Sequence, residues 1–337
     1  MILVGSLGLV VWLNWRGRSV KRLDLLHAGY TLAKRLPVVM TYVINLGVPP
    51  LLFVQVLYGQ QIYSSSVLIG ALWISVIFLL MLAYWLIYRT IHAMENSKAA
   101  WPIAALSLLV VMGIGQIYSM NMTLMLRPEV WKDMYWNSPS GVQGVTGDPS
   151  VTPRWLFVMA GGPLVGGLWA ALMGQMRYLD DSVREVLRKS GGMSAVIGAA
   201  LMFGFGYRVL AVQPEHVSTG IAGSPIHNVS LILCALTILA AGAIGGLQCF
   251  WKSATVFAST MGVVVAFLAA ATSGIVRDGI RDFTLKEKGF DLSHVPIYPN
   301  WSVLIVFLLL FVIMLATIYW LLQVMRQATP PKEEIAL

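Results

Sequence analysis

The residues of this chain that could bind a ligand lie within, or at the ends of, long apolar segments. Asn45, Gln55 and Tyr58 surround a Pro-Pro pair at 49–50 inside one such segment. Because proline has no N–H, the carbonyls one turn earlier lose their usual hydrogen-bond partners. At membrane depth such carbonyls are tolerated only against protein, water or a ligand. The segment therefore predicts either a binding site or a plain packing kink.

A second group of polar residues consists of arginines at segment ends that share one side of the predicted bundle: Arg127, Arg208, Arg277 and Arg281. Their position runs against the usual distribution of cations in membrane proteins, so another interaction should hold them there. Glu129, Asp278 and Asp282 could neutralise them, and pairing does not prevent the group from lining a site. Since a carboxylate beside an arginine can exchange protons, Arg277 and Asp278 are the candidate catalytic pair.

Other polar positions are fewer. Asn121 lies in the polar last third of a segment and is a candidate hydrogen-bond donor. Cys234 and Cys249 stand fifteen residues apart in one apolar segment, where they are expected to pack as small apolar side chains. The sequence predicts no metal site, and without Cys-x-x-Cys-His no covalently attached haem c.

The composition excludes an ordinary soluble domain. Of 337 residues, 58% are hydrophobic and 11% charged, with a mean hydropathy of +0.75. Nine apolar runs approach the roughly 20 residues that cross a bilayer, at 2–15, 36–58, 66–89, 101–126, 155–176, 191–212, 228–250, 254–276 and 302–325. We interpret the first as a spanning helix with its outer end shortened, not as a signal peptide, because basic residues follow it. The prediction is one all-α polytopic domain over 1–337.

The distribution of basic residues predicts the orientation. Residues 16–35 and 177–189 are rich in Lys and Arg, whereas 59–65 and 213–226 contain neither. The positive-inside rule then places the N-terminus outside and the C-terminus inside. The inner basic loop 16–35 is expected to form a surface helix with Leu25, Leu26 and Tyr30 facing lipid. The basic residues form no continuous stripe, so no nucleic-acid partner is predicted.

Two outer loops are expected, at 127–154 and 277–300. The first contains Trp131, Tyr135 and Trp136 and then a turn-rich run. Such a loop can dock a partner, cover a pocket or remain a simple connection.

Three short stretches carry a resemblance to a known family: INLGV at 44–48, MLRP at 125–128 and RWLFV at 154–158. With the number of helices and the outside N-terminus, they make the chain similar to subunit I of the cytochrome bd quinol oxidases. The resemblance is best over about 36–175. It implies a multi-pass subunit of a respiratory complex in the bacterial inner membrane, with a quinol site and haem groups.

The departures from that family concern the haem ligands. The family uses a His in helix one, a His in helix five, a Met in helix seven and a Glu in helix eight. In this chain the first and eighth segments lack these residues, and Met159 occupies the position of the second His. The acids of helices two and three and the long quinol loop are also absent. The resemblance therefore implies no oxygen-reducing centre, and leaves open one haem b held by Met159 and His227.

The leading hypothesis is a membrane subunit of an electron-transfer complex. It would bind quinone near the outer face, partner other membrane subunits, and pass electrons to or from a periplasmic cytochrome or iron–sulfur protein. Gln55, Tyr58, Asn121 and Arg208 could supply hydrogen bonds, with Arg277 and Asp278 handling the proton. The alternatives are a non-catalytic anchor for a multihaem cytochrome or iron–sulfur complex, an oxidase-like subunit carrying haem b, and a transporter using the Pro-Pro break.

Overall fold

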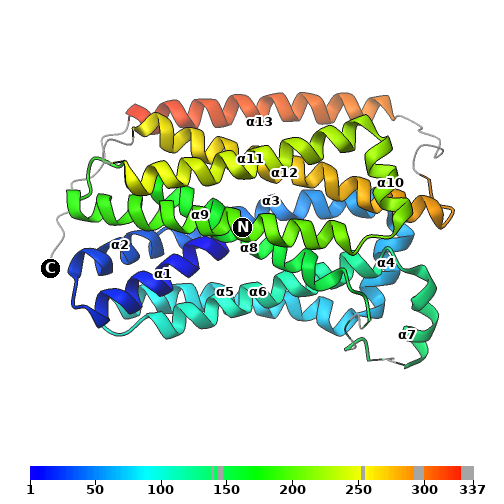
Figure 1. Ribbon diagram of the computed structural model, residues 1–337, viewed down its shortest axis with the longest axis horizontal. Helices are drawn as coiled ribbons and strands as arrows, with labels where there is room; N and C mark the ends of the chain where they lie inside the picture. The colour runs from blue at the N-terminus through cyan, green and yellow to red at the C-terminus, as the bar shows by residue number, and fades with distance from the viewer. Residues whose placement is uncertain (138–139, 143, 145–146, 252–254, 292–299, 328–337) are drawn as a thin grey trace. The chain divides into compact units, whose positions relative to one another are not determined.

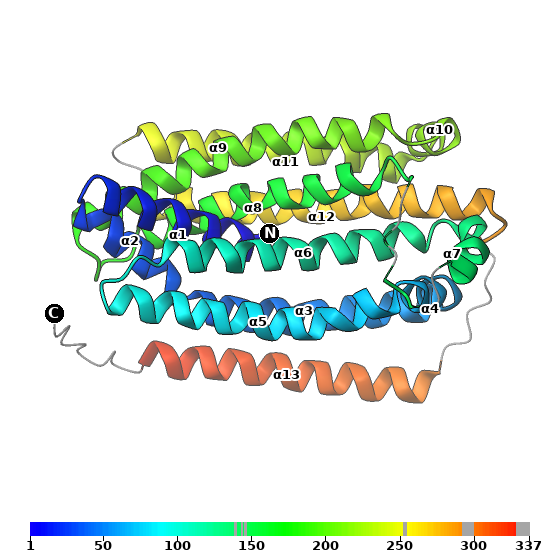
Figure 2. The same ribbon diagram turned by 90° about the horizontal axis from the view of Figure 1, so that it is seen from below.

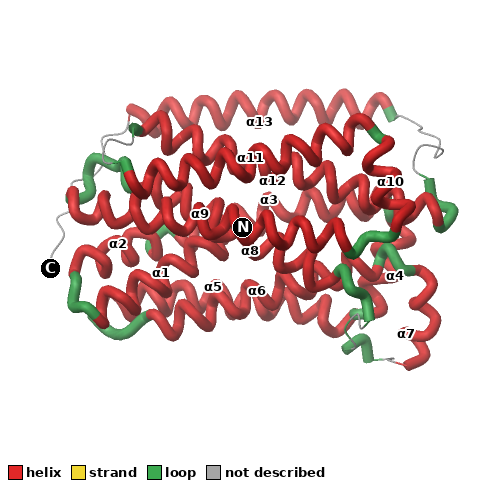
Figure 3. Tube along the Cα trace, viewed as in Figure 1, coloured by secondary structure: helices red, strands yellow, loops and turns green. Residues whose placement is uncertain are grey.

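The computed structural model describes residues 1–337 apart from 138–139, 143, 145–146, 252–254, 292–299 and 328–337. The described residues form helices and no strand (Figures 1 and 3), which confirms the expected all-α class. They divide into two compact units, Met1–Phe290 and Asp291–Leu337. The helices of the first unit are α1 Ile2–Ser19, α2 Leu23–Ala33, α3 Leu36–Leu57, α4 Gly59–Leu68, α5 Gly70–Glu95, α6 Trp101–Leu124, α7 Trp131–Asn137, α8 Val151–Met173, α9 Asp181–Ala211, α10 Glu215–Gly223, α11 Pro225–Phe250 and α12 Val256–Glu287. The second unit contributes α13, Trp301–Gln327.

Eight helices among the described residues are long and apolar enough to cross a membrane, with α2 and α3 counted as one stretch, Leu23–Leu57. The others are α5, α6, α8, α9, α11, α12 and α13. The first expected segment, 2–15, does form a helix, α1, but Asn14, Arg16 and Arg18 occupy its end. This helix is not one of the eight. The chain is therefore a multi-pass membrane protein surrounded by a lipid bilayer.

Glycines hold the centre of the first unit together. A Cβ atom on Gly5 of α1 would overlap the backbone of α8 at Gly162, and one on Gly167 of α8 would overlap α9 at Gly191. Gly192 of α9 meets α11 at Gly245 in the same way. Small residues allow backbones to approach closely where lipid gives no hydrophobic driving force. These glycines thus lie at helix crossings.

The inner basic loop of the prediction is a helical hairpin. Residues 16–19 extend α1, and α2 packs against α1 through its buried face. The prediction that Leu25 faces lipid is wrong, because its side chain is buried and lies against Gly17. Tyr30 instead donates a hydrogen bond to Glu95 (2.9 Å).

Several expected loops are helices. The polar turn at 59–65 lies in α4, and residues 277–287 of the predicted outer loop continue α12 for three more turns. The loop at 127–154 contains α7, and 213–226 contains α10. The Pro-Pro pair lies inside α3, which continues as a helix to Leu57.

The short helices α4, α7 and α10 gather at one end of the first unit, seen on the right in Figures 1 and 2. The ends of α3, α6, α9 and α12 and the start of α8 and α11 adjoin them. We call this the polar end. The opposite end, where α1 joins α2, α5 joins α6 and α8 joins α9, is the basic end.

Candidate functional site

Tyr58 is the centre of the candidate site at the polar end. It follows the last residue of α3 and is only 2% exposed. Its hydroxyl donates a hydrogen bond to Oδ1 of Asp282 on α12 (2.6 Å). Its ring lies 4.2 Å from the guanidinium carbon of Arg281 and 5.9 Å from the ring of Phe290. A phenol held between a carboxylate and a cation can donate or accept a proton without moving.

Arg281 links this tyrosine to two carboxylates on its own helix. It forms an ion pair with Asp278, one turn earlier, and its Nε lies 3.7 Å from Oδ1 of Asp282. The Arg281 side chain is 16% exposed, whereas that of Asp278 is 50% exposed. The last turns of α12 therefore present a partly buried cation, a carboxylate that accepts the hydrogen bond of the phenol and a carboxylate open to the surroundings.

The protonation state of Tyr58 follows from the same contacts. Tyr58 lies just beyond the span that ends at Leu57. Burial, and then the hydrogen bond to Asp282, raises the pKa of Tyr58 from 10.0 to about 12. The hydroxyl consequently keeps its proton near neutral pH and acts there as a hydrogen-bond donor.

An ion network beside the site ties the end of α12 to the end of α6. Lys288 donates to the carbonyl of Leu126 and to Oε2 of Glu129, both at 2.7 Å. Arg127 meets Glu129 at 3.3 Å and Asp148 at 3.5 Å. Burial tends to raise the pKa of Glu129, but the hydrogen bonds from Lys288 and Arg127 outweigh it and lower that pKa. The network fixes Arg127 as a structural cation.

The candidate catalytic pair is arranged differently from the prediction. The ion-pair partner of Asp278 is Arg281 rather than Arg277. Arg277 is exposed on α12, one turn before Arg281, and among the described residues it has no carboxylate within ion-pair distance. The structure thus joins three predicted site residues, Tyr58, Asp278 and Arg281, and leaves Arg277 beside them.

The remaining candidates lie apart from Tyr58. Asn121 is fully buried in α6, donates to Ser66 Oγ (3.0 Å), and leaves its own Oδ1 buried with no hydrogen-bond partner among the described residues. Gln55 is half-buried on α3. Asn45 on α3 and Arg208 near the end of α9 are both exposed.

The two candidate haem ligands have different neighbours. Met159 lies against Gly115 of α6. His227 packs on Gly279 and Phe283 of α12, and its Nδ1 is 2.8 Å from Ser224 Oγ. Among the described residues, no three His, Cys, Asp or Glu side chains are grouped so that they could hold a metal ion.

Asp282 is the site residue for which the sequence analysis predicts only the neutralisation of an arginine. It stands 224 residues from its partner, Tyr58. One signal could have identified it: if α12 is extended to Glu287, Asp278, Arg281 and Asp282 fall at helical spacings of three and four and so share a face. The predicted end of this helix near residue 276 hid that signal.

The site lies beside a poorly covered part of α3. From Thr41 to Leu57 none of the residues of α3 is buried, although α3 packs on α1, α4 and α5. Leu52, Phe53 and Val56 are exposed apolar side chains within two turns of Tyr58. The described residues therefore leave apolar surface next to the buried phenol.

No protein-family model matches this chain, and neither a curated protein nor a solved structure matches it.

Proposed function

We propose that this chain is a membrane subunit of a respiratory electron-transfer complex in the bacterial inner membrane. It binds a quinone or quinol at the polar end and exchanges electrons with a periplasmic cytochrome or iron–sulfur protein. The observation that carries the proposal is the buried Tyr58, hydrogen-bonded to Asp282 and stacked under Arg281, next to the uncovered apolar side of α3. The resemblance to the cytochrome bd quinol oxidases supports the same class of substrate.

The residues present fit the chemical needs of a quinone. A quinone head is flat and apolar with two oxygens that accept hydrogen bonds, so it needs apolar surface and a few placed donors. Leu52, Phe53 and Val56 offer the apolar surface. The exposed Arg277 and the partly buried Arg281 offer the donors. The Tyr58 hydroxyl oxygen, whose own proton is donated to Asp282, can accept a hydrogen bond from a quinol.

The proton path follows from the two carboxylates. Oxidation of a quinol to a quinone releases two protons and two electrons. A proton leaving the quinol oxygen at Tyr58 reaches Asp282 through the 2.6 Å hydrogen bond, and Asp282, whose side chain is 39% exposed, passes it to water. Asp278, half-exposed beside Arg281, can carry the second proton to water, while Arg281 itself stays protonated. The two electrons reduce two one-electron centres of the partner. In the opposite direction, reduction of a quinone takes up two protons and two electrons by the same route.

The test uses the purified native complex with quinol and its redox partner. Tyr58→Phe and Asp282→Asn should each lower quinol-dependent reduction of the partner by about 100-fold or more, the scale of a lost general acid or base. Asp181→Asn, at the basic end with a 95% exposed side chain, is the matched control and should leave the rate unchanged. Wild-type rates in both site variants would refute the proposal.

A second candidate, the non-catalytic anchor, is favoured by one observation. Tyr135 and Trp136 of α7 are 60% and 72% exposed and contact each other edge to face at 5.7 Å. An exposed aromatic pair suits a docking surface for a redox protein. A Tyr135→Ala/Trp136→Ala variant that releases the partner, combined with a complex that shows no quinol-dependent turnover, would favour anchoring.

The remaining alternatives have separate tests. An absorption spectrum of the native complex with a b-type signal lost in Met159→Leu and His227→Gln would favour a haem-carrying subunit. Substrate uptake by proteoliposomes that contain this chain alone would favour a transporter.

A further inference from the structure

The first unit contains a small cavity at its basic end that the proposed function does not use. The cavity has a volume of about 210 Å³ and is lined by Arg89, His92, Ala93, Asn96, Lys98, Ala99 and Ile103. Clefts that enclose a drug-sized ligand have about 300–1,000 Å³. Its size therefore suits a small head group and not a quinone ring with its tail.

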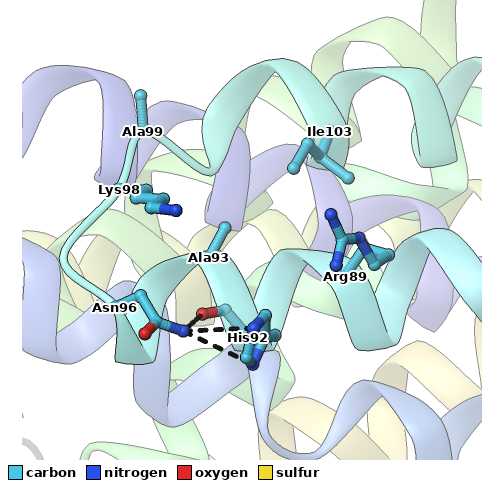
Figure 4. Close-up of a pocket in the computed structure, with 7 residues that line it drawn as sticks. All are labelled: Arg89, His92, Ala93, Asn96, Lys98, Ala99 and Ile103. Atoms are coloured by element: carbon cyan, nitrogen blue, oxygen red, sulfur yellow. Dashed lines mark hydrogen bonds between the residues drawn. The ribbon is translucent and has the colours of Figure 1, made fainter.

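Arg89 of α5 and Lys98 of the loop that follows α5 bring positive charge to this cavity. Arg89 and His92 stand three residues apart on one face of α5, and Lys98 comes from the loop before α6 (Figure 4). No carboxylate lines the cavity, and the nearest acid on α5, Glu95, accepts the hydrogen bond of Tyr30. Among the described residues Arg89 and Lys98 have no ion-pair partner; Arg89 instead lies 5.8 Å from the ring of Trp85. The charge of the cavity is thus uncompensated.

The loop geometry fixes Lys98 in place. Ser97 has a left-handed φ of 53°, and the amides of Ser97 and Lys98 donate to the carbonyls of Met94 and Ala93 at 3.0 and 2.8 Å. This pair of hydrogen bonds is the Schellman ending of a helix, which turns the chain back over the last turn of α5. Arg18 of α1 holds the same loop through the carbonyl of Ser97 (2.6 Å).

The first backbone amides of α6 do not bind the anion. The amides of Ala100 and Trp101 both donate to Oδ1 of Asn14 on α1, at 3.1 and 3.0 Å. Recognition of an anion here falls to the side chains of Arg89, His92 and Lys98.

Apolar surface continues from the cavity along α5. The helix face of Arg89 continues toward the start of α5 through three exposed side chains, at steps of four, three and four residues: Trp85, Leu82 and Phe78. Leu106 of α6, one turn beyond Ile103, is also exposed. A charged cavity joined to an apolar strip matches a molecule with a phosphate head and acyl chains.

We propose that the Arg89–His92–Lys98 cavity binds the phosphate of an anionic phospholipid, with the acyl chains along the exposed face of α5. Basic pockets between membrane helices recognise such head groups, and each Lys or Arg near an anionic surface contributes about 1 kcal/mol. The proposal is independent of the quinone site.

Native mass spectrometry of the full chain in detergent tests it, with dioleoyl phosphatidylglycerol and dioleoyl phosphatidylcholine as probes. Wild type should prefer phosphatidylglycerol, and Arg89→Gln/Lys98→Gln should weaken its binding by about 30-fold, the equivalent of two such charges. Arg16→Gln/Arg177→Gln removes two exposed charges elsewhere at the basic end and should keep wild-type affinity.

Three results would overturn the proposal. Equal binding of the two lipids would show that the anionic head group is not recognised. An equal loss of phosphatidylglycerol affinity in both double variants would indicate general charge attraction. Displacement of phosphatidylglycerol by millimolar inorganic phosphate would identify a site for free anions. Unchanged thermal unfolding of the Arg89→Gln/Lys98→Gln variant confirms that the lipid effect is local.

Discussion

The hydroxyl of Tyr58 at the end of α3 donates a hydrogen bond to Asp282 near the end of α12, although the two residues are 224 positions apart in the chain. This hydrogen bond joins the residue that ends α3 to α12. Through this contact a tyrosine at a helix end becomes a buried phenol that is hydrogen-bonded to a carboxylate.

Tyr58→Phe should destabilise the protein. The variant keeps the ring under Arg281 but removes a hydrogen bond to a charged group, which is worth about 1.5–3 kcal/mol. Chemical unfolding in detergent should show a loss in that range. Tyr63→Phe, whose parent side chain is 58% exposed, should unfold like wild type.

The stabilisation by Tyr58 should also depend on pH at the alkaline end. Its folded-state pKa, about 12, is raised above the ordinary 10.0. The contribution is therefore fully present below about pH 10 and is lost as the pH rises through about 12. The difference in unfolding midpoint between wild type and Tyr58→Phe should stay constant from neutral pH to about pH 9 and shrink above pH 10; a difference independent of alkaline pH would contradict the assignment.

Glu129 should confer stability that is lost in acid. Its pKa is lowered from the ordinary 4.5 by Lys288 and Arg127, which overcome the opposing effect of burial. A depressed folded-state pKa contributes stability above the ordinary pKa and loses it as the pH falls through the folded value. Glu129→Gln should unfold earlier than wild type at neutral pH, and the two unfolding curves should converge below pH 4.5. Curves that diverge in acid would refute this role.

Gly191→Ala should loosen the contact between α8 and α9. The new Cβ would meet the carbonyl of Gly167 and the amide of Ala171, backbone atoms that cannot move aside alone. Overpacking of this kind costs about 1–3 kcal/mol. Gly204→Ala on the same helix has no atom within 4 Å of the added methyl group and should be neutral or slightly stabilising. Equal unfolding midpoints for the two variants would argue against this crossing.

Arg188→Met should destabilise the end of α11. Arg188 is 8% exposed and donates to the carbonyls of Gln248 and Trp251 at 2.5 and 2.6 Å. Its removal leaves both carbonyls without this donor, at about 1.5–3 kcal/mol for each charged bond. Hydrogen exchange should increase at residues 245–250 in this variant. The exposed Arg177→Met is the matched control, and comparable exchange in the two variants would be inconsistent with the capping role.

Much of the fold follows from local sequence. The apolar runs predict α3, α5, α6, α8, α9, α11, α12 and α13, because a helix that crosses a bilayer must satisfy its backbone internally and expose apolar side chains along its own length. The close helix crossings at Gly162, Gly167 and Gly191 have a similarly local cause, since only a missing Cβ permits that approach.

The sequence could not determine at which residue the helices with polar ends terminate, or which charged side chains form pairs. The charged residues after 276 resemble a loop by composition, yet they continue the helix α12. Two contacts stabilise this extension: Arg281 pairs with Asp278, and Asp282 accepts the hydrogen bond of Tyr58. The sequence by itself therefore determined an all-α membrane protein and a set of candidate polar residues. Only the tertiary structure decided that Tyr58, Arg281 and Asp282 form one site, because their contacts join helices whose order in the chain does not specify their neighbours in space.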